Sequence, residues 1–399
     1  MKITRRLFAF LLPISTLAVL VLTLAAGKPA ATSHYLAFVG TYTNKTESKG
    51  IYAYDFDSAT GKLTAMGLAI ESADPSYLVI HPSGKFAYTA NESGKQSFIS
   101  AFSIDPKSAK LTLLNKLPAL GEDPCYLSFD KTGKFLFVAN YTSGNVVVFP
   151  ILPDGKLGEH TALLTDAGTL GPNKKRQDGP HAHWIEPTTY NRSVFVADLG
   201  LDRILFYDFD SSKGTLALHD ETVSAHRPFA QNSLELELGT GPRHAATAKH
   251  HDSRQFIYVL GELDSTVTVF ANSKEGIFGP IQKISTLPAG YSGRNDAAEI
   301  ILHPNGKWLF ASNRGHDSIA VFSVDPAKGT LTPTGDFPTG GKEPRHFALD
   351  PTGQFLLAEN QLSNSIMVFR INPATGALTQ VSQTDGIPSP VCLVFLPIP

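Results

Sequence analysis

The chain repeats a two-strand pattern along most of its length. The clearest copies are ADPSYLVIHPSGKFAYTANES (from Ala73), EDPCYLSFDKTGKFLFVANYT (from Glu122), AAEIILHPNGKWLFASNRG (from Ala297) and KEPRHFALDPTGQFLLAENQL (from Lys342). Each copy places apolar stretches on both sides of a tight turn, which is typical of two antiparallel strands. A third strand follows that ends in V-F or A-F, as in GNVVVFPI. Internal repetition of this kind indicates a repeat architecture.

A second signature marks the turn between the third and fourth strands. It has the form D-x-x-x-G-x-L and recurs from Asp57, Asp105, Asp210, Asp325 and Asn372, with variants from Leu152 and Asn272. An Asp or Asn opens such a turn by bonding its own backbone, and glycine supplies a positive φ. Seven four-stranded units spaced about 46 to 62 residues apart predict a β-propeller.

The two ends of the repeat are complementary. YLAFVGTYT (from Tyr35) matches a second strand, and SPVCLVFLP (from Ser389) matches a first strand. The C-terminal strand should therefore complete the N-terminal blade and remove free sheet edges. We predict an all-β fold, a seven-bladed β-propeller of four-stranded antiparallel blades that occupies residues 34–399 as a single domain.

Residues 1–33 have a different character. Lys2, Arg5 and Arg6 precede an apolar run that ends in small residues. This order is typical of a secretory signal peptide. The run is nearly long enough to span a bilayer, so an uncleaved anchor is the alternative. We predict a periplasmic or secreted protein that is not inserted in the membrane once the signal is removed.

Composition excludes some partners. Charged residues make up 18% of the chain and the formal net charge is −2, so no basic excess points to nucleic acid. The two cysteines, Cys125 and Cys392, fall on blades that are not neighbours. Although an exported protein could pair its cysteines, we predict two buried thiols.

Two rings of positions should line one end of the central channel. In a propeller blade the start of the innermost strand and the end of the second strand lie at the same face. The repeat alignment gives an inner-strand ring of Val391, Ser76, Cys125, His181, Arg243, Ala298 and Arg345. The second-strand ring contains Thr41, Glu92, Tyr141, Leu199, Glu262, Arg314 and Gln361.

The polar residues are unevenly distributed around these rings. Blades four to seven contribute His181, Arg243, Glu262, Arg314, Arg345 and Gln361. Long connections enter blades four, five and six on the same face, and such loops commonly carry function. We therefore predict a small-molecule site at this channel mouth. The run Lys174-Lys175-Arg176 should lie on the rim of this mouth. It either forms a solvated loop face or attracts an anionic ligand.

Histidines near the mouth allow several interpretations. In DGPHAHWIE, the two-residue spacing turns both His181 and His183 to the channel, with His181 at the mouth and His183 deeper. An H-x-H pair can bind a metal, but no third suitable ligand is evident, so we predict no metal. Strand alternation predicts that His244 and His346, which follow ring arginines, point away from the channel and pack between blades.

The sequence resembles the lactonase family of seven-bladed propellers, which includes propeller-type 6-phosphogluconolactonases and carboxy-cis,cis-muconate cyclases. The resemblance covers the chain from about Tyr35 onward. It is carried by VGTYT (from Val39), DGPHAH (from Asp178), GPRH (from Gly241), GELDSTV (from Gly261) and SNRGHDSI (from Ser312). One departure is Gly261, where the family usually has Asn before the Glu.

The resemblance implies a catalytic set of His181, Arg243, Glu262 and Arg314, with His183 as an alternative for the histidine. His183, Arg345 and Gln361 are then expected to bind substrate. The arginines would hold an acidic group or the developing oxyanion, and Glu262 or His181 would transfer protons.

The predicted function is therefore hydrolysis of a lactone by a monomer that needs no cofactor or metal. The partner is a small-molecule lactone or organic acid, and no nucleic acid is expected. Three alternatives remain. They are a cyclase that closes a lactone on an unsaturated acid, a metal-dependent lactonase, and a propeller that only binds ligands.

Overall fold

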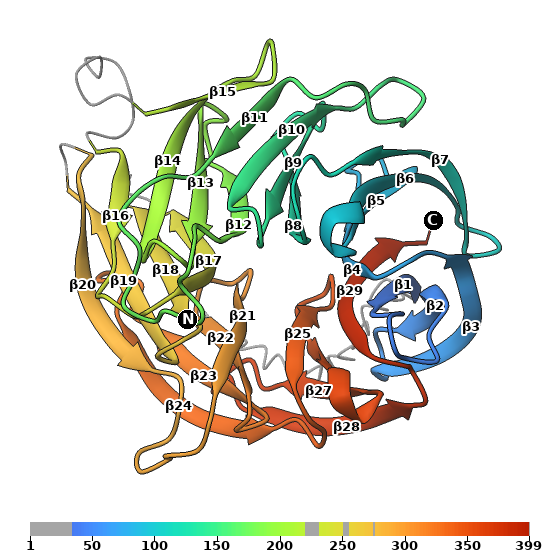
Figure 1. The fold of residues 1–399 in the computed structure, drawn as a ribbon. Helices are drawn as coiled ribbons and strands as arrows, with labels where there is room; N and C mark the ends of the chain where they lie inside the picture. The colour runs from blue at the N-terminus through green and yellow to red at the C-terminus, as the bar shows by residue number, and fades with distance from the viewer. Residues whose placement is uncertain (1–33, 220–230, 250–254, 274–275, 399) are drawn as a thin grey trace, which may run out of the picture. The chain divides into compact units, whose positions relative to one another are not determined.

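The computed structural model describes residues 34–219, 231–249, 255–273 and 276–398, which belong to one compact unit, Ser33–Pro399. The segment predicted to be a signal peptide lies outside the described residues. Seven antiparallel sheets follow one another around a ring in the described part of the chain (Figure 1). The predicted seven-bladed β-propeller is confirmed.

Blades two to four run outward from an inner strand in chain order. Blade two contains β4 (Pro75–Ile80), β5 (Phe86–Asn91), β6 (Phe98–Asp105) and β7 (Lys110–Pro118). Blade three contains β8 (Pro124–Phe129), β9 (Phe135–Asn140), β10 (Asn145–Pro150) and β11 (Ala162–Thr165). Blade four contains β12 (Ala182–Pro187), β13 (Ser193–Asp198), β14 (Arg203–Asp210) and β15 (Thr215–Leu218), and β16 (Ser233–Glu235) also pairs with β14.

Blades five to seven follow the same rule. Blade five contains β17 (Pro242–Lys249), β18 (Gln255–Gly261), β19 (Thr266–Asn272) and β20 (Phe278–Ser285). Blade six contains β21 (Asp296–Leu302), β22 (Trp308–Arg314), β23 (Ser318–Val324) and β24 (Leu331–Pro338). Blade seven contains β25 (Pro344–Leu349), β26 (Phe355–Asn360), β27 (Ser365–Ile371) and β28 (Leu378–Asp385).

Blade one closes the ring from both ends of the repeat. It contains β29 (Pro390–Pro397), β1 (His34–Thr41), β2 (Gly50–Asp57) and β3 (Lys62–Glu71). Strands β1 and β29 are antiparallel, with Tyr35 opposite Pro397 and Val39 opposite Leu393. The predicted closure is confirmed, because the C-terminal strand β29 supplies the inner strand of the blade that the N-terminal strands form.

The glycine of the recurring turn also explains how blades pack. These glycines have positive φ, and an added Cβ would lie within about 2.6 Å of an aromatic side chain on the preceding blade. The pairs are Gly61 on Phe355, Gly155 on Phe86, Gly214 on Phe135, Gly329 on Phe256 and Gly376 on Trp308. The motif therefore combines a turn that favours glycine with a close contact that requires it.

Each inner strand carries a β-bulge after its first pair or, in blade six, after its second pair. The register shifts next to Pro75, Pro124, Ala182, Pro242, Ala297, Pro344 and Pro390. A bulge adds an unpaired residue and changes the direction of nearby side chains, so strict alternation does not hold there.

Short 3-10 turns occur at η1 (Gly94–Gln96) and η3 (Gln361–Ser363). Among the described residues, no helix is long and apolar enough to cross a membrane.

Candidate active site

The bulges correct the predicted inner-strand ring in blade four. Ala182 pairs with Asp198, the last residue of β13, and the register then skips His183. In blade seven, Pro344 pairs with Asn360, the last residue of β26, and the register skips Arg345. His183 therefore occupies the ring position that the sequence alignment gave to His181, and His181 lies just before the ladder begins.

The second-strand ring needs one correction, in blade one. Thr41 pairs with the Pro390 that precedes the bulge, so the residue equivalent to Glu92 is Tyr42. Thr41 is buried and bonds to Ser48 and to Gly50 O. The prediction missed Tyr42, although the dipeptides TY, NE and NY at the ends of these strands could have aligned it.

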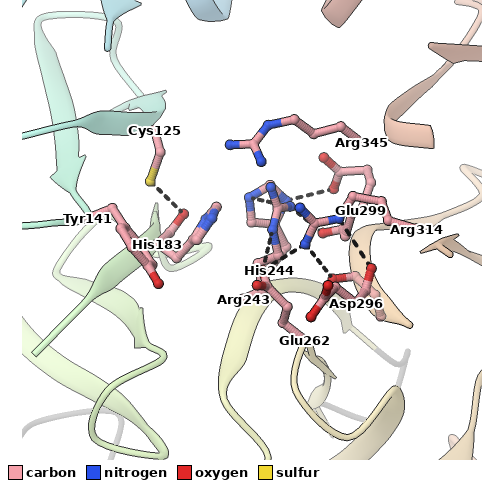
Figure 2. A network of polar contacts seen from close by, with 12 residues as sticks. Cys125, Tyr141, His183, Arg243, His244, Glu262, Asp296, Glu299, Arg314 and Arg345 are labelled. Atoms are coloured by element: carbon pink, nitrogen blue, oxygen red, sulfur yellow. Dashed lines mark hydrogen bonds and ion pairs between the residues drawn. The ribbon is translucent and has the colours of Figure 1, made fainter. Parts of the chain in front are cut away.

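Glu262 belongs to a cluster of charged side chains, and Figure 2 shows it near Arg243 and Arg314. Its Oε2 lies 3.0 Å from Arg243 Nε and 3.0 Å from Arg314 Nη2, and its Oε1 accepts a hydrogen bond from Arg176. The Arg243 contact is an ion pair whose angle does not make a hydrogen bond. The side chains of Glu262 and Arg243 are 4% and 3% exposed. The structure thus brings together Glu262, Arg243 and Arg314, which were predicted to form one site.

Arg176 reaches this cluster from the long connection into blade four. Besides Glu262, it contacts Asp296 Oδ1 at 3.6 Å and donates to the Tyr141 hydroxyl at 3.3 Å. The sequence placed Arg176 only on the rim. The connection begins well before β12, and nothing in its local pattern indicates that this side chain turns inward.

Arg345 makes the longest ion pair of the four arginines. Its nearest carboxylate oxygen, Glu92 Oε2, is 4.0 Å from Nη2. Tyr42 stacks beneath the guanidinium at 5.5 Å and donates its hydroxyl proton to Glu92 at 2.7 Å. Figure 2 shows the guanidinium directed toward Arg243 and His183. Arg345 therefore has donors available for an anionic or carbonyl oxygen.

The electrostatics of the cluster follow from burial and crowding. Burial on its own raises the pKa of Glu262, but Arg314, Arg243 and Arg176 outweigh it, and the pKa falls to about 2. Burial, together with Arg314 and Arg345, lowers the pKa of Arg243 to about 10. Glu262 is therefore a firmly ionised carboxylate and a weak base at neutral pH.

His181 lies beside this cluster. Its ring stacks on Tyr141 at 4.6 Å and 14°. Nδ1 lies 3.0 Å from Tyr141 O and Nε2 lies 3.0 Å from Asp178 Oδ1, so both nitrogens face acceptors. Asp198 accepts the backbone N–H of His181 at 2.9 Å and so holds the turn in place. Contacts between described residues lead from His181 to Tyr141, then to Arg176 and on to Glu262.

His183 and His244 lie deeper. Their rings meet at 5.1 Å, and His183 Nδ1 is buried with no hydrogen bond to a described residue. Burial, Arg243 and His244 lower the pKa of His183 well below its usual value, so the imidazole is neutral at neutral pH.

The prediction that His244 and His346 turn away from the channel is wrong. His244 contacts Tyr77 of blade two and Tyr126 of blade three, and His346 also contacts Tyr77. Contacts with blades on the far side of the ring are only possible from inside the channel. The bulge is the reason, because it directs both Arg243 and His244 inward.

The structure also locates Gln361 and the two cysteines, which the sequence analysis singled out. Gln361 is half-buried in η3 and donates its backbone N–H to Glu343 O, outside the Glu262 cluster. Within the described part of the chain, no group of three or more His, Cys, Asp or Glu side chains is placed to hold a metal ion. Cys125 and Cys392 are separate buried thiols, as predicted.

The structure therefore defines a seven-bladed propeller that gathers arginines, a glutamate and histidines at one end of its inner strands. Residues 36–395 match the model of a known family, described as lactonase, 7-bladed beta-propeller. The chain belongs to this family and is a lactonase-type enzyme.

Several relatives share nearly the full length. A 6-phosphogluconolactonase of Bacillus subtilis is 34% identical over 363 residues, which are 91% of this chain and 98% of the relative. A structure of a 6-phosphogluconolactonase proposed for Bacteroides fragilis is 35% identical with a TM-score of 0.81, covering 92% of this chain and 99% of that one. The periplasmic gluconolactonase of Pseudomonas aeruginosa is 30% identical with a TM-score of 0.82, covering 92% and 100%.

Proposed function

We propose that this enzyme hydrolyses a sugar lactone without a metal ion, at the end of the channel where Arg243, Glu262, Arg314 and Arg345 meet. One observation carries the proposal: Glu262 is held by three guanidinium groups, while Arg345 faces the same space and its ion pair with a described carboxylate is 4.0 Å long. Four arginines repel a metal cation. They attract the oxyanion and the carboxylate that form when a lactone opens.

Arg243 and Arg345 are the proposed donors to the lactone carbonyl. Arg243 directs Nε to Glu262 and Nη1 to Ala298 O, and no described residue bonds to its Nη2. A donor fixed in this way costs no reorganisation when negative charge develops on the carbonyl oxygen. Arg314 and Arg176 hold Glu262 from its other sides, and His183, whose ring meets His244 in the channel, is proposed to contact the substrate.

Glu262 is proposed to orient the attacking water. Because its pKa is about 2, it accepts a hydrogen bond from the water without keeping the proton. The water oxygen bonds to the carbonyl carbon, the ring C–O bond breaks, and the ring oxygen takes a proton. The products are an aldonate and one released proton. His181, which has the exposed Asp178 on Nε2, is the proposed proton-transfer group.

The substrate is proposed to be an unphosphorylated aldonolactone met outside the cytoplasm. The basic and apolar segment in residues 1–33 supports export. A similar protein of Pseudomonas aeruginosa is described as a periplasmic gluconolactonase. We propose a periplasmic location on these grounds, with removal of residues 1–33 leaving the propeller as the mature domain.

The proposal is tested by titrating acid release from glucono-1,5-lactone and from its 6-phosphate in a pH-stat, with and without EDTA. Wild type should exceed the spontaneous rate, unaffected by chelator. Arg243→Lys should lower kcat by about 100-fold or more, since it removes a preorganised donor. Arg203→Lys is the matched control, because Arg203 pairs with a Glu235 that is 71% exposed.

Each other outcome contradicts the proposal. Loss of activity with EDTA favours a metal-dependent lactonase. Faster closure of an unsaturated acid than opening of any lactone favours the cyclase alternative. Absence of turnover with retained aldonate binding favours a propeller that only binds ligands.

A further inference from the structure

A buried chain of titratable groups runs behind Arg243, away from Glu262. Arg243 Nη1 lies 3.4 Å from His244 Nε2, and His244 Nδ1 lies 2.9 Å from Glu299 Oε1. Glu299 Oε2 lies 3.7 Å from His346 Nε2, and His346 Nδ1 lies 2.7 Å from Glu359 Oε2. None of the five side chains in this buried series, from Arg243 to Glu359, is more than 10% exposed. Figure 2 shows its first part, from Arg243 through His244 to Glu299.

These groups belong to a second tier of the channel. The residue that follows the bulge position on each inner strand forms this tier: Tyr77, Tyr126, Trp184, His244, Glu299, His346 and Cys392. Blades two to four contribute aromatic rings, which pack on one another and on His244. Blades five to seven contribute ionisable groups, on the same side as the arginines. Aromatic rings would fill the channel equally well, so the ionisable groups need another explanation.

The hydrogen bonds select one tautomer of His244. Burial on its own raises the pKa of Glu299, but His244, His346 and Arg243 outweigh it, and the pKa falls to about 2. Burial lowers the pKa of His244 to about 4 even though Glu299 opposes it. At neutral pH the ring therefore carries one proton, and the carboxylate of Glu299 keeps that proton on Nδ1. Nε2 then presents a lone pair to Arg243 Nη1.

We propose that His244 and Glu299 are positioning residues for Arg243, with Glu299 fixing the tautomer in which His244 accepts a hydrogen bond from the guanidinium. The inference rests on the proposed role of Arg243 in lactone opening. The opposite tautomer would set an N–H of His244 against an N–H of Arg243 and displace the guanidinium. A shift of about 1 Å in such a group costs on the order of 100-fold in rate.

The charges and titratable groups around His244 come from six blades. They are Tyr77, Tyr126, His183, Arg243, Glu299 and His346. Arg243 and His346 disfavour a charged His244 and Glu299 favours it. Below about pH 4 His244 gains a second proton on Nε2, and its lone pair is no longer available to Arg243. We therefore expect activity that depends on Arg243 to fall on acidification as His244 titrates.

The kinetic test compares two variants of the same position. His244→Phe keeps a ring but has no acceptor, and should lower kcat by about 10- to 100-fold. His244→Gln supplies an amide oxygen near the Nε2 position, and should stay within about 3-fold of wild type and lose the fall in kcat/KM near pH 4. Tyr77→Phe is the control, because it touches His244 but not Arg243. Equal losses in both His244 variants, with the acidic fall unchanged, would overturn the proposal.

A readout independent of turnover uses ¹⁵N-histidine labelling of the whole protein. The His244 signals, identified by their loss in His244→Gln, should show a proton on Nδ1 and a bare Nε2 at pH 7. A proton on Nε2 overturns the proposal even if the enzyme is active. If wild type opens no lactone, the proposed function fails, but the Nδ1–H tautomer and weaker gluconate binding by His244→Phe in calorimetry still support the positioning role.

Discussion

Replacing Glu262 with Gln should destabilise the fold by about 3 kcal/mol at pH 7. The carboxylate is 4% exposed and lies against Arg243, Arg314 and Arg176. Its pKa drops from 4.5 to about 2, and each pKa unit corresponds to about 1.4 kcal/mol of preference for the ionised form. The result agrees with the 3–5 kcal/mol that is typical when one partner is removed from a buried ion pair.

The loss should depend on pH in a defined direction. A carboxyl group whose pKa is depressed on folding contributes stability that is present above its unfolded pKa and is lost as the pH falls through its folded pKa. For Glu262 this window runs from about pH 5 down to about pH 2. The difference between wild type and Glu262→Gln should therefore shrink from about 3 kcal/mol at pH 7 to about 1.5 kcal/mol at pH 3.

Urea unfolding of both proteins at pH 7 and pH 3 measures this difference. Glu235→Gln is the matched control, since it makes the same change in an exposed pair with Arg203 and should cost less than about 1 kcal/mol. A pH-independent difference for Glu262→Gln, or a loss no larger than that of the control, would refute the electrostatic account of the cluster.

Two further predictions concern packing. Gly200→Ala should cost about 1–3 kcal/mol, because its Cβ would lie 1.8 Å from Gly179 O and 3.2 Å from the His181 ring. Gly179→Ala meets no atom within 4 Å and is the control, so equal melting temperatures for the two variants would contradict the account. The thiols of Cys125 and Cys392, 6% and 0% exposed and with pKa values raised by burial, should react with Ellman's reagent only on unfolding. Rapid reaction of the native protein would be inconsistent with this burial.

The fold was predictable because its signals are local. Each turn is indicated by an Asp or Asn followed by a glycine, and each strand is indicated by its apolar stretch. The repeat supplies seven copies of these signals. The convergence of Arg243, Glu262 and Arg314 was predictable for a related reason, since equivalent positions of a repeat come together once the ring closes.

The tertiary structure alone decided the fine arrangement of the site. A bulge inserts one residue and redirects its neighbours, and its position depends on packing around the channel. The sequence therefore aligned His181 where His183 lies, and turned His244 outward although it lies behind Arg243. Arg176 enters from a long connection that has no repeat to align it. Repeating local patterns determine which blades meet, whereas bulges and loops, which do not repeat identically, determine which side chains touch.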